Sequence, residues 1–171
     1  MFTYFSRMSA RVFVFAVLVL AVSCTSEKQA SLEIGDSAPG FALLDLEGKS
    51  VNLADYGGSP VVIRFFLTDC KFCRADTPIL NEYYIRYAEK GLRMLYIDSL
   101  GIERVRLNSF AEEFEIAFPV VQDTGGRIAS DYKVRALPQT IVLDPEHRII
   151  AAILGGVSEP ELNKLLSPYL D

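Results

Sequence analysis

The chain has 171 residues, half of them hydrophobic, and this length and composition are typical of a globular domain rather than a disordered segment. Its net charge of −5 and the lack of a dense run of Lys and Arg argue against a nucleic-acid partner. A structural zinc site usually needs four Cys or His ligands, and the pair Cys70 and Cys73 has no second pair and only the single His147 to join it, so we expect neither a metal nor a cofactor.

The N-terminus has the pattern of a targeting segment. Arg7 and Arg11 precede an uninterrupted apolar run over residues 12–22, which is short for a membrane span of about 20 residues but suits the core of a signal peptide. The stretch "LAVSC" then resembles a lipobox, the lipoprotein signal in which the cysteine after the cleavage site, here Cys24, is acylated, although Ala21 stands where Leu is preferred. A signal peptide or signal anchor that ends near a cysteine by chance is the alternative.

The chain is therefore expected to have three parts. Residues 1–23 are the signal, the polar residues 24–31 are a tether, and residues 32–171 form one domain. With either kind of signal the domain works outside the cytoplasm, where a pair of cysteines can be oxidised. The lipoprotein interpretation adds an anchor in the membrane.

The pattern of apolar residues from Leu32 onward predicts an α/β domain. The expected elements, in chain order, are a hairpin over 41–58 that turns at Glu47–Gly48, a strand over 60–67, a helix over 71–90, a strand over 92–99, a helix over 103–116, an extended segment over 118–123, a short helix over 126–134, strands over 139–144 and 148–154, and a helix over 159–170. This order gives a mixed sheet with a parallel core, an antiparallel edge hairpin and helices on both faces. The residues expected to face inward from the first two long helices are Ile79, Leu80, Tyr83 and Tyr87, and then Val105, Phe110 and Phe114.

The two close cysteines lie at the end of the first buried strand and the start of the helix after it, where open α/β sheets place their sites. Free backbone N–H groups and the helix dipole favour a thiolate at Cys70, and Lys71 adds positive charge, whereas the carboxylate of Asp69 opposes a second anion. Cys73 lies one turn further on, so we expect it to be less exposed and to act as the resolving thiol. An inert structural disulfide is the alternative, although so small a ring constrains the unfolded chain little.

The chain from Leu32 to Leu170 resembles the thioredoxin-like extracytoplasmic thiol–disulfide oxidoreductases, the TlpA/ResA-like group of the redoxin or AhpC-TSA superfamily. The resemblance rests on an Ala-Pro-x-Phe motif and a Gly-Lys turn before the core strand, on Phe65, Cys70, Cys73 and Pro78, and on the later stretches "FPVVQD", "YKVRALPQT" and "IVLDPEHRI". The family usually has Trp before the first cysteine and Pro before the second, and this chain departs from it there, with Asp69 and Phe72.

The resemblance implies a thioredoxin-like fold and an enzyme, a thiol–disulfide oxidoreductase that cycles Cys70 and Cys73 between dithiol and disulfide. It would reduce disulfides in exported proteins, with cytochrome c maturation as one setting, and a membrane redox donor protein would reload it. The resemblance also implies that Leu137 and Pro138 form a cis-proline loop that presents its backbone to an extended substrate. Asp76, where the family often has Glu, would accept the proton of Cys73; a solvated helix acid is the alternative.

Two other functions occur on related folds. A thiol peroxidase would need Pro-x-x-x-Thr-x-x-Cys, but counting back from Cys70 gives Leu67 and Ile63 at the Thr and Pro positions. A copper-delivery protein would need Cys-x-x-x-Cys with a His, whereas the spacing here is one residue short and His147 falls in an expected turn. Both remain alternatives to the oxidoreductase.

Overall fold

A computed structural model of the chain describes residues 32–170. The expected signal, the tether and Cys24 lie outside the described residues. Within the described part, no helix combines the length and the apolar character needed to cross a membrane.

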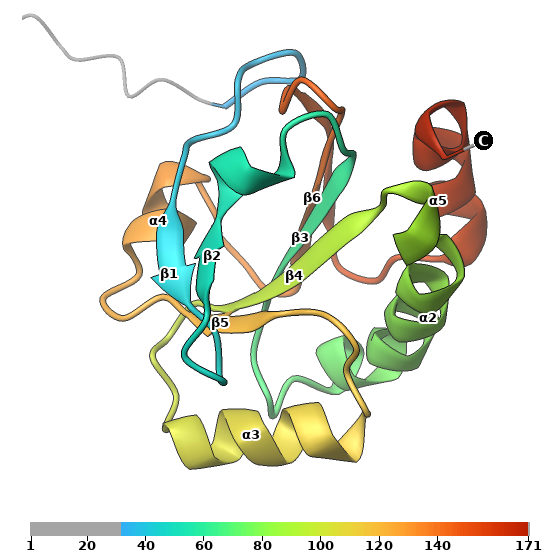
Figure 1. Cartoon of the computed structure of the whole chain (residues 1–171). Coiled ribbons are helices and arrows are strands. Elements are labelled where there is room, and N and C mark those ends of the chain that lie inside the picture. The colour runs from blue at the N-terminus through green and yellow to red at the C-terminus, as the bar shows by residue number, and fades with distance from the viewer. Residues whose placement is uncertain (1–31, 171) are drawn as a thin grey trace, which may run out of the picture. The chain divides into compact units, whose positions relative to one another are not determined.

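Within residues 32–170, five strands form one mixed sheet in the order β5-β4-β3-β6-β7 (Figure 1). The strands are β3 (Val61–Phe66), β4 (Arg93–Asp98), β5 (Val120–Gln122), β6 (Gln139–Leu143) and β7 (Ile149–Leu154). β4 runs parallel to both β3 and β5, whereas β6 runs antiparallel to both β3 and β7. The predicted parallel core and antiparallel edge hairpin are confirmed.

A separate two-stranded antiparallel sheet precedes this one, as predicted, and consists of β1 (Ala42–Leu44) and β2 (Ser50–Asn52). Its turn is closed by Asp45, whose Oδ1 accepts hydrogen bonds from the N–H groups of Glu47 (2.9 Å) and Lys49 (2.8 Å). Gly48 takes a positive φ of 84° there, a conformation in which a side chain would be strained. The short 3-10 helix η1 (Leu53–Tyr56) leads from the hairpin toward β3.

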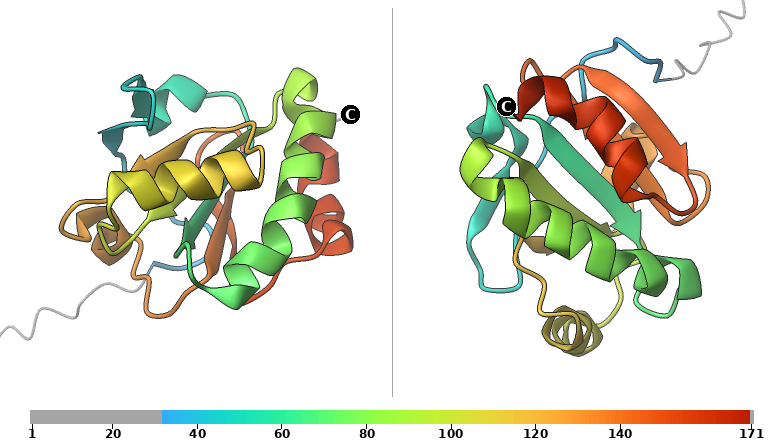
Figure 2. Two further views of the ribbon diagram at one scale, coloured as in Figure 1. Left: turned by 90° about the horizontal axis from the view of Figure 1, so that it is seen from below. Right: turned by 90° about the vertical axis from the view of Figure 1, so that its right-hand side faces the viewer.

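Helices and the hairpin cover the two faces of the sheet. The helical elements are α2 (Lys71–Tyr87), η2 (Ala88–Lys90), α3 (Arg104–Glu113), α4 (Arg127–Asp131), α5 (Glu159–Leu166) and η3 (Ser167–Tyr169). Residues of α2, α3 and α5 share one buried cluster with one face of the sheet, and residues of α4 and the hairpin share another cluster with the opposite face. α2 and α5 lie side by side (Figure 2), joined at the surface by an ion pair between Arg86 and Glu159.

The central strand β3 is buried on both faces, and its side chains alternate between the two clusters. Val62 and Phe66 belong to the cluster under α2 and α5, and Val61, Ile63 and Phe65 to the other. Position 64 therefore points toward α2 and α5. It holds an arginine that is 0% exposed, within a strand whose other residues are all apolar.

The inward faces of the long helices were predicted only in part. Leu80 and Phe110 are buried as expected, but Ile79 is 38% and Val105 73% exposed. Val105 and Phe110 are five residues apart, or about 140° around a helix, so they cannot both face a flat sheet. Leu107 is buried instead.

The first described residues run along the outer edge of the sheet, beside the turn between β6 and β7. The N–H of Gly35 donates to the carbonyl of Ile149 (2.8 Å), the N–H of Ile149 to that of Asp36 (2.9 Å), and the N–H of Ala38 to that of His147 (2.9 Å). Since β7 starts opposite the end of β6 and the beginning of β3, this segment lies at the end of the sheet where β3 begins.

Candidate active site

Cys70 and Cys73 lie at the N-terminus of α2, just beyond the carboxyl end of β3. Cys70 is the N-cap residue, with an extended backbone, and its Sγ accepts a hydrogen bond from the N–H of Cys73 at 3.4 Å. Both are free thiols; Cys70 is half-buried and Cys73 is fully buried. The predicted N-cap position of Cys70 and the deeper position of Cys73 match the structure.

The two thiols differ strongly in acidity. Partial burial disfavours a thiolate at Cys70, but hydrogen bonds from the Cys73 thiol and from the N–H groups of Cys73 and Phe72, together with the charge of Arg64, outweigh it and lower the pKa of Cys70. Burial raises the pKa of Cys73 to about 12, and its interaction with Cys70 acts in the same direction. Cys70 is thus the group that can ionise, and Cys73 is a thiol that donates to it.

The charged neighbours in sequence act differently from expectation. Asp69, expected to oppose a thiolate at Cys70, forms an ion pair with Arg106 of α3, and this hydrogen bond lowers the pKa of the Asp69 carboxyl. Lys71 places its Nζ 4.9 Å from the centre of the Phe72 ring, and Arg64, below the helix, is a cation whose charge lowers the pKa of Cys70. The ring of Phe72, between the two cysteines, is 57% exposed.

Asp76, one turn after Cys73, belongs to a buried ion pair. Its Oδ2 lies 2.5 Å from Nη2 of Arg64 and also accepts the N–H of Val157 at 3.2 Å. Nη1 of Arg64 donates to Oγ1 of Thr140 (2.6 Å) and to the carbonyl of Gly155 (3.2 Å). Oδ1 of Asp76 accepts no hydrogen bond from the described residues, so one oxygen stays available.

Sequence reasoning missed Arg64, although a signal was present. A charged residue in a strand that is buried on both faces must be paired, because an isolated charge in a core is very costly. The partner should come from the element that covers the same face, and Asp76 on the following helix meets that condition.

Leu137 and Pro138 lie at the same end of the sheet as the cysteines. β6 begins directly after Pro138, and its first residue, Gln139, pairs with Phe65 near the end of β3. The Leu137–Pro138 peptide bond is cis, as the resemblance implied, and the carbonyl of Pro138 accepts the N–H of Gly155 at 2.8 Å. The structure therefore brings Cys70, Cys73, Asp76 and Pro138 to the end of the sheet where β3 finishes.

The histidine that the copper-delivery alternative would need does not join this site. His147 lies in the turn between β6 and β7, at the opposite end of the sheet, so it cannot share a metal with Cys70 and Cys73. Thr68, two residues before Cys70, is buried and directs its hydroxyl toward the carboxylate of Asp69 (3.5 Å). Within residues 32–170, no group of three or more Cys, His, Asp or Glu side chains is arranged to hold a metal.

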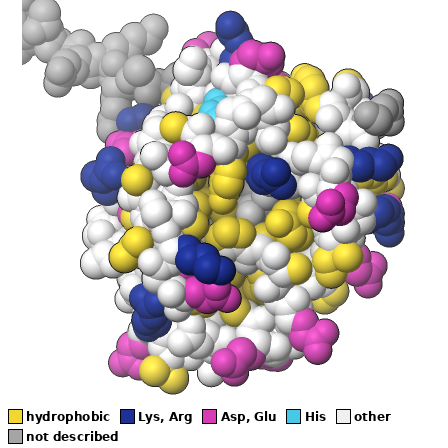
Figure 3. All heavy atoms as spheres, viewed as in Figure 1, with side chains coloured by type: hydrophobic (Ala, Val, Ile, Leu, Met, Phe, Trp, Pro, Cys, Tyr) yellow, Lys and Arg dark blue, Asp and Glu magenta, His cyan; other side chains and the backbone are white. Residues whose placement is uncertain are grey.

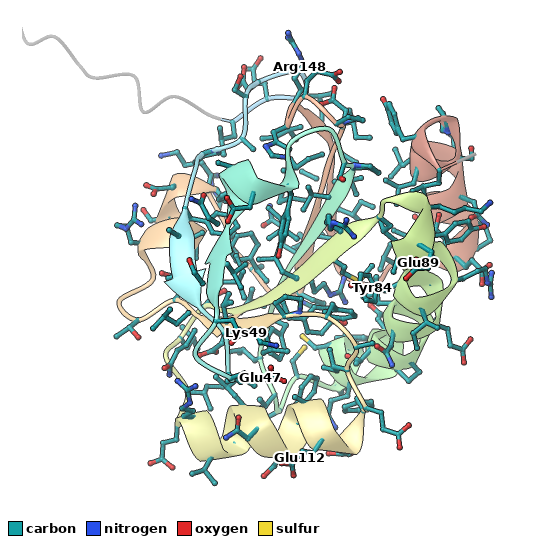
Figure 4. The ribbon with its side chains drawn as sticks, viewed as in Figure 1. Glu47, Lys49, Tyr84, Glu89, Glu112 and Arg148 are labelled. Atoms are coloured by element: carbon teal, nitrogen blue, oxygen red, sulfur yellow. The ribbon has the colours of Figure 1, made fainter. Side chains whose placement is uncertain are left out.

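A separate hollow of about 310 Å³ lies between the hairpin turn and the region that joins α3 to β5. Glu47 and Lys49 form an ion pair (2.6 Å) on its rim, and Figure 4 shows them across from α3, which carries Glu112. Hydrophobic side chains gather at the centre of this face in Figure 3. No residue from 70 to 73 lines the hollow, so it does not belong to the thiol site.

Comparison with known proteins agrees with the geometry of the thiol site. The sequence model of the AhpC/TSA family matches residues 34–152. A "Thiol-disulfide oxidoreductase ResA" of Bacillus thuringiensis subsp. konkukian is 33% identical over 166 residues, which cover 94% of this chain and 95% of the relative. The ResA of Bacillus subtilis is 26% identical over 94% of this chain and 92% of its own. The solved thioredoxin domain of a thiol-disulfide oxidoreductase from Bacteroides vulgatus is 27% identical with a TM-score of 0.72, covering 82% of this chain and all of that one.

The difference between the thiols predicts how each should titrate. In Cys73→Ser, which keeps a hydroxyl donor beside Cys70, thiolate absorbance should rise at a pH below the ~8.5 of a free cysteine. In Cys70→Ser, the remaining thiol should still be protonated at pH 9, because burial raises its pKa to about 12. Ultraviolet absorbance of the thiolate across pH 4–11 measures both. Equal midpoints in the two variants would contradict the assignment.

Proposed function

The chain belongs to the AhpC/TSA family and is a thiol–disulfide oxidoreductase with a thioredoxin-like fold, and on this basis we propose that it reduces disulfide bonds in exported proteins, outside the cytoplasm and from a membrane anchor. The observation that carries this proposal is the contrast between Cys70, an accessible thiol whose pKa is lowered, and Cys73, a buried thiol hydrogen-bonded to it. One thiol can attack a substrate, and the other can attack only Cys70.

The reaction follows from these positions. The Cys70 thiolate attacks one sulfur of the substrate disulfide, forming a mixed disulfide, and the second substrate sulfur leaves as a thiolate. Cys73 then loses its proton and attacks the sulfur of Cys70, which forms the Cys70–Cys73 disulfide and releases the first substrate sulfur. The substrate gains two electrons and two protons, one from Cys73 and one from solvent. A dithiol donor protein at the membrane restores the pair by the reverse exchange.

Asp76 is proposed to accept the proton of Cys73. A thiol with a pKa of about 12 does not ionise by itself at neutral pH, so its attack needs a base. Asp76 is three residues further along the same helix, and its Oδ1 accepts no hydrogen bond from the described residues. These features fit a carboxylate that serves as that base.

The loop at Leu137 and Pro138 is proposed to bind the substrate backbone. It lies beside the carboxyl end of β3, and Leu137 is half-buried rather than covered. An extended segment placed there can pair with backbone groups, as peptides do when they add to a sheet edge. Such a site takes unfolded or loosely folded exported proteins, and apocytochrome c with an oxidised Cys-x-x-Cys-His segment is one substrate of that class.

The assignment of the two sulfurs predicts opposite behaviour of their variants. Cys73→Ser should accumulate mixed disulfides with substrate, because Cys70 still attacks and nothing releases the product. Cys70→Ser should accumulate few, and both variants should lose more than about a hundredfold in insulin-disulfide reduction. Non-reducing gels and an insulin turbidity assay measure these outcomes. Trapping by Cys70→Ser alone would reverse the roles, and unchanged turnover in both would leave the pair a structural one.

The proposed base predicts a pH-dependent defect. Asp76→Asn should slow insulin reduction by roughly a hundredfold at pH 7, and the defect should shrink toward pH 10, where hydroxide can remove the Cys73 proton. The matched control is Glu82→Gln, which changes an exposed acid on the same helix and should leave the rate unchanged. A defect of the same size at every pH would mean that Asp76 only supports the structure.

The proposed anchor rests on the sequence of the N-terminus. If Cys24 is acylated, Cys24→Ala should abolish metabolic labelling with palmitate and leave a longer, uncleaved chain. Labelling and chain length are read from gels of membrane fractions, with Cys70→Ser as the control that keeps both. An unchanged length in Cys24→Ala would favour cleavage elsewhere or a retained N-terminal helix.

A further inference from the structure

Arg64 occupies a fully buried position of the central strand. In the sheet register it lies between Tyr96 on β4 and Thr140 on β6, and all three residues are 0% exposed. A charge in such a place is costly unless hydrogen bonds satisfy it, and its removal from water must be compensated by well-placed partners. If the residue at position 64 served only to pack the core, an apolar side chain would be expected, as at Val62 and Phe66 on the same face of the strand.

The partners of Arg64 are the two segments that form the site. Nη2 binds Asp76 on the helix that carries both cysteines, at 2.5 Å. Nη1 binds Thr140, two residues after Pro138, and the carbonyl of Gly155, whose own N–H donates to the carbonyl of Pro138. The guanidinium of Arg64 therefore connects α2, which carries both cysteines, to the segment around Pro138, from the side of the sheet.

The charge of Arg64 also acts on the two sulfurs. It favours the ionised form of both Cys70 and Cys73, and Nε has no hydrogen-bond partner among the described residues. The groups that face it are Asp76 and the two thiols from α2 and the Tyr96 hydroxyl from β4, which bonds to Thr77. Nearer the surface, Asp69 pairs with Arg106, and Arg74 pairs with Glu113.

We propose that Arg64 is a positioning residue that sets the redox poise of the Cys70–Cys73 pair, through the fixed charge it holds beneath the helix. The proposal rests on the proposed function, because it concerns the same pair. Reduction of the disulfide takes up two electrons and one proton, and leaves a thiolate at Cys70 with a thiol at Cys73. A negative charge appears that the disulfide lacks, so a fixed cation nearby stabilises the reduced form. The pair is consequently a weaker reductant than it would be without Arg64.

Arg64→Gln tests this directly in the whole chain. Its equilibrium constant for reduction by dithiothreitol or glutathione should fall about tenfold, equivalent to ~30 mV for two electrons. Its Cys70 thiolate should also titrate at higher pH. Arg64→Lys, which keeps the charge but not the planar fork, should stay within about threefold of the wild type. Arg93→Gln is the matched control, since it removes the same charge at the start of β4, opposite Val61 at the other end of β3, and should change neither quantity.

A second pair of variants guards against misfolding, because Arg64→Gln leaves the Asp76 carboxylate unpaired. Asp76→Asn and Arg64→Gln/Asp76→Asn differ only at position 64, and the double variant buries no lone charge. The reduction constant should again be about tenfold lower in the variant without the arginine.

The outcomes separate the two proposals. The role of Arg64 is overturned if a folded Arg64→Gln variant keeps the reduction constant and the Cys70 titration of the wild type. It is also overturned if the double variant keeps those of Asp76→Asn, or if Arg64→Lys and Arg64→Gln shift them equally. In these cases the proposed function is still supported if the Cys70–Cys73 pair of the wild type is reversibly oxidised and reduced by the redox buffer. A wild-type pair that does not exchange with the redox buffer at all rejects the proposed function together with this inference.

Discussion

The ion pair between Arg64 and Asp76 joins the centre of the sheet to the helix that carries the thiols, and the arrangement of the site depends on it. Buried pairs of this kind contribute little net stability, because desolvation offsets most of the attraction, but loss of one partner typically costs about 3–5 kcal/mol. The pair therefore acts mainly as a constraint on geometry. It fixes how α2 lies on β3, and through Gly155 it fixes where the Pro138 loop lies relative to Cys70.

A different kind of contact holds the exposed side of the site. α3 is joined to the start of α2 by ion pairs of Arg106 with Asp69 and of Arg74 with Glu113, and Arg74 also donates to the carbonyl of Thr68 (3.2 Å). The side chains of these pairs are between 36% and 73% exposed, so water screens the attraction between the charges, and the pairs weaken with salt. The pair with Arg106 nevertheless explains how the chain tolerates the carboxylate of Asp69 beside a thiolate. The base of the site is thus fixed by buried contacts and its rim by contacts that water and salt can loosen.

Much of the fold could be predicted from the sequence because its signals are local. The apolar run that becomes β3, the turn at Glu47–Gly48 and the position of Cys70 at a helix start each follow from a few neighbouring residues. The errors arose where the outcome depends on which face of a helix packs on the sheet. Val105 has the apolar character of a core residue, but it lies about 140° from Phe110 around α3, and the residue buried on the side of Phe110 is Leu107.

The same distinction holds for the site. Both cysteines could be found from their spacing, and Pro138 from the resemblance to a known family. Arg64 was missed although an arginine in a strand buried on both faces must have a partner, because the sequence does not decide which acid of the covering helix supplies it, and Asp76 is equally well explained as a solvated helix acid. Likewise the charge effects of Asp69 and Lys71 were judged from sequence neighbours. In the structure Arg106 pairs with Asp69, and Lys71 lies over the ring of Phe72.

The path of the first described residues has a consequence for how the active site can be reached. Residues 35–38 run beside His147 and Ile149, whereas Cys70 lies beyond the far end of β3, about 20 Å away for a six-residue strand. The beginning of the described domain and its reactive thiol therefore lie at opposite ends of the sheet. A protein substrate can approach Cys70 without contacting residues 35–38 or the turn between β6 and β7.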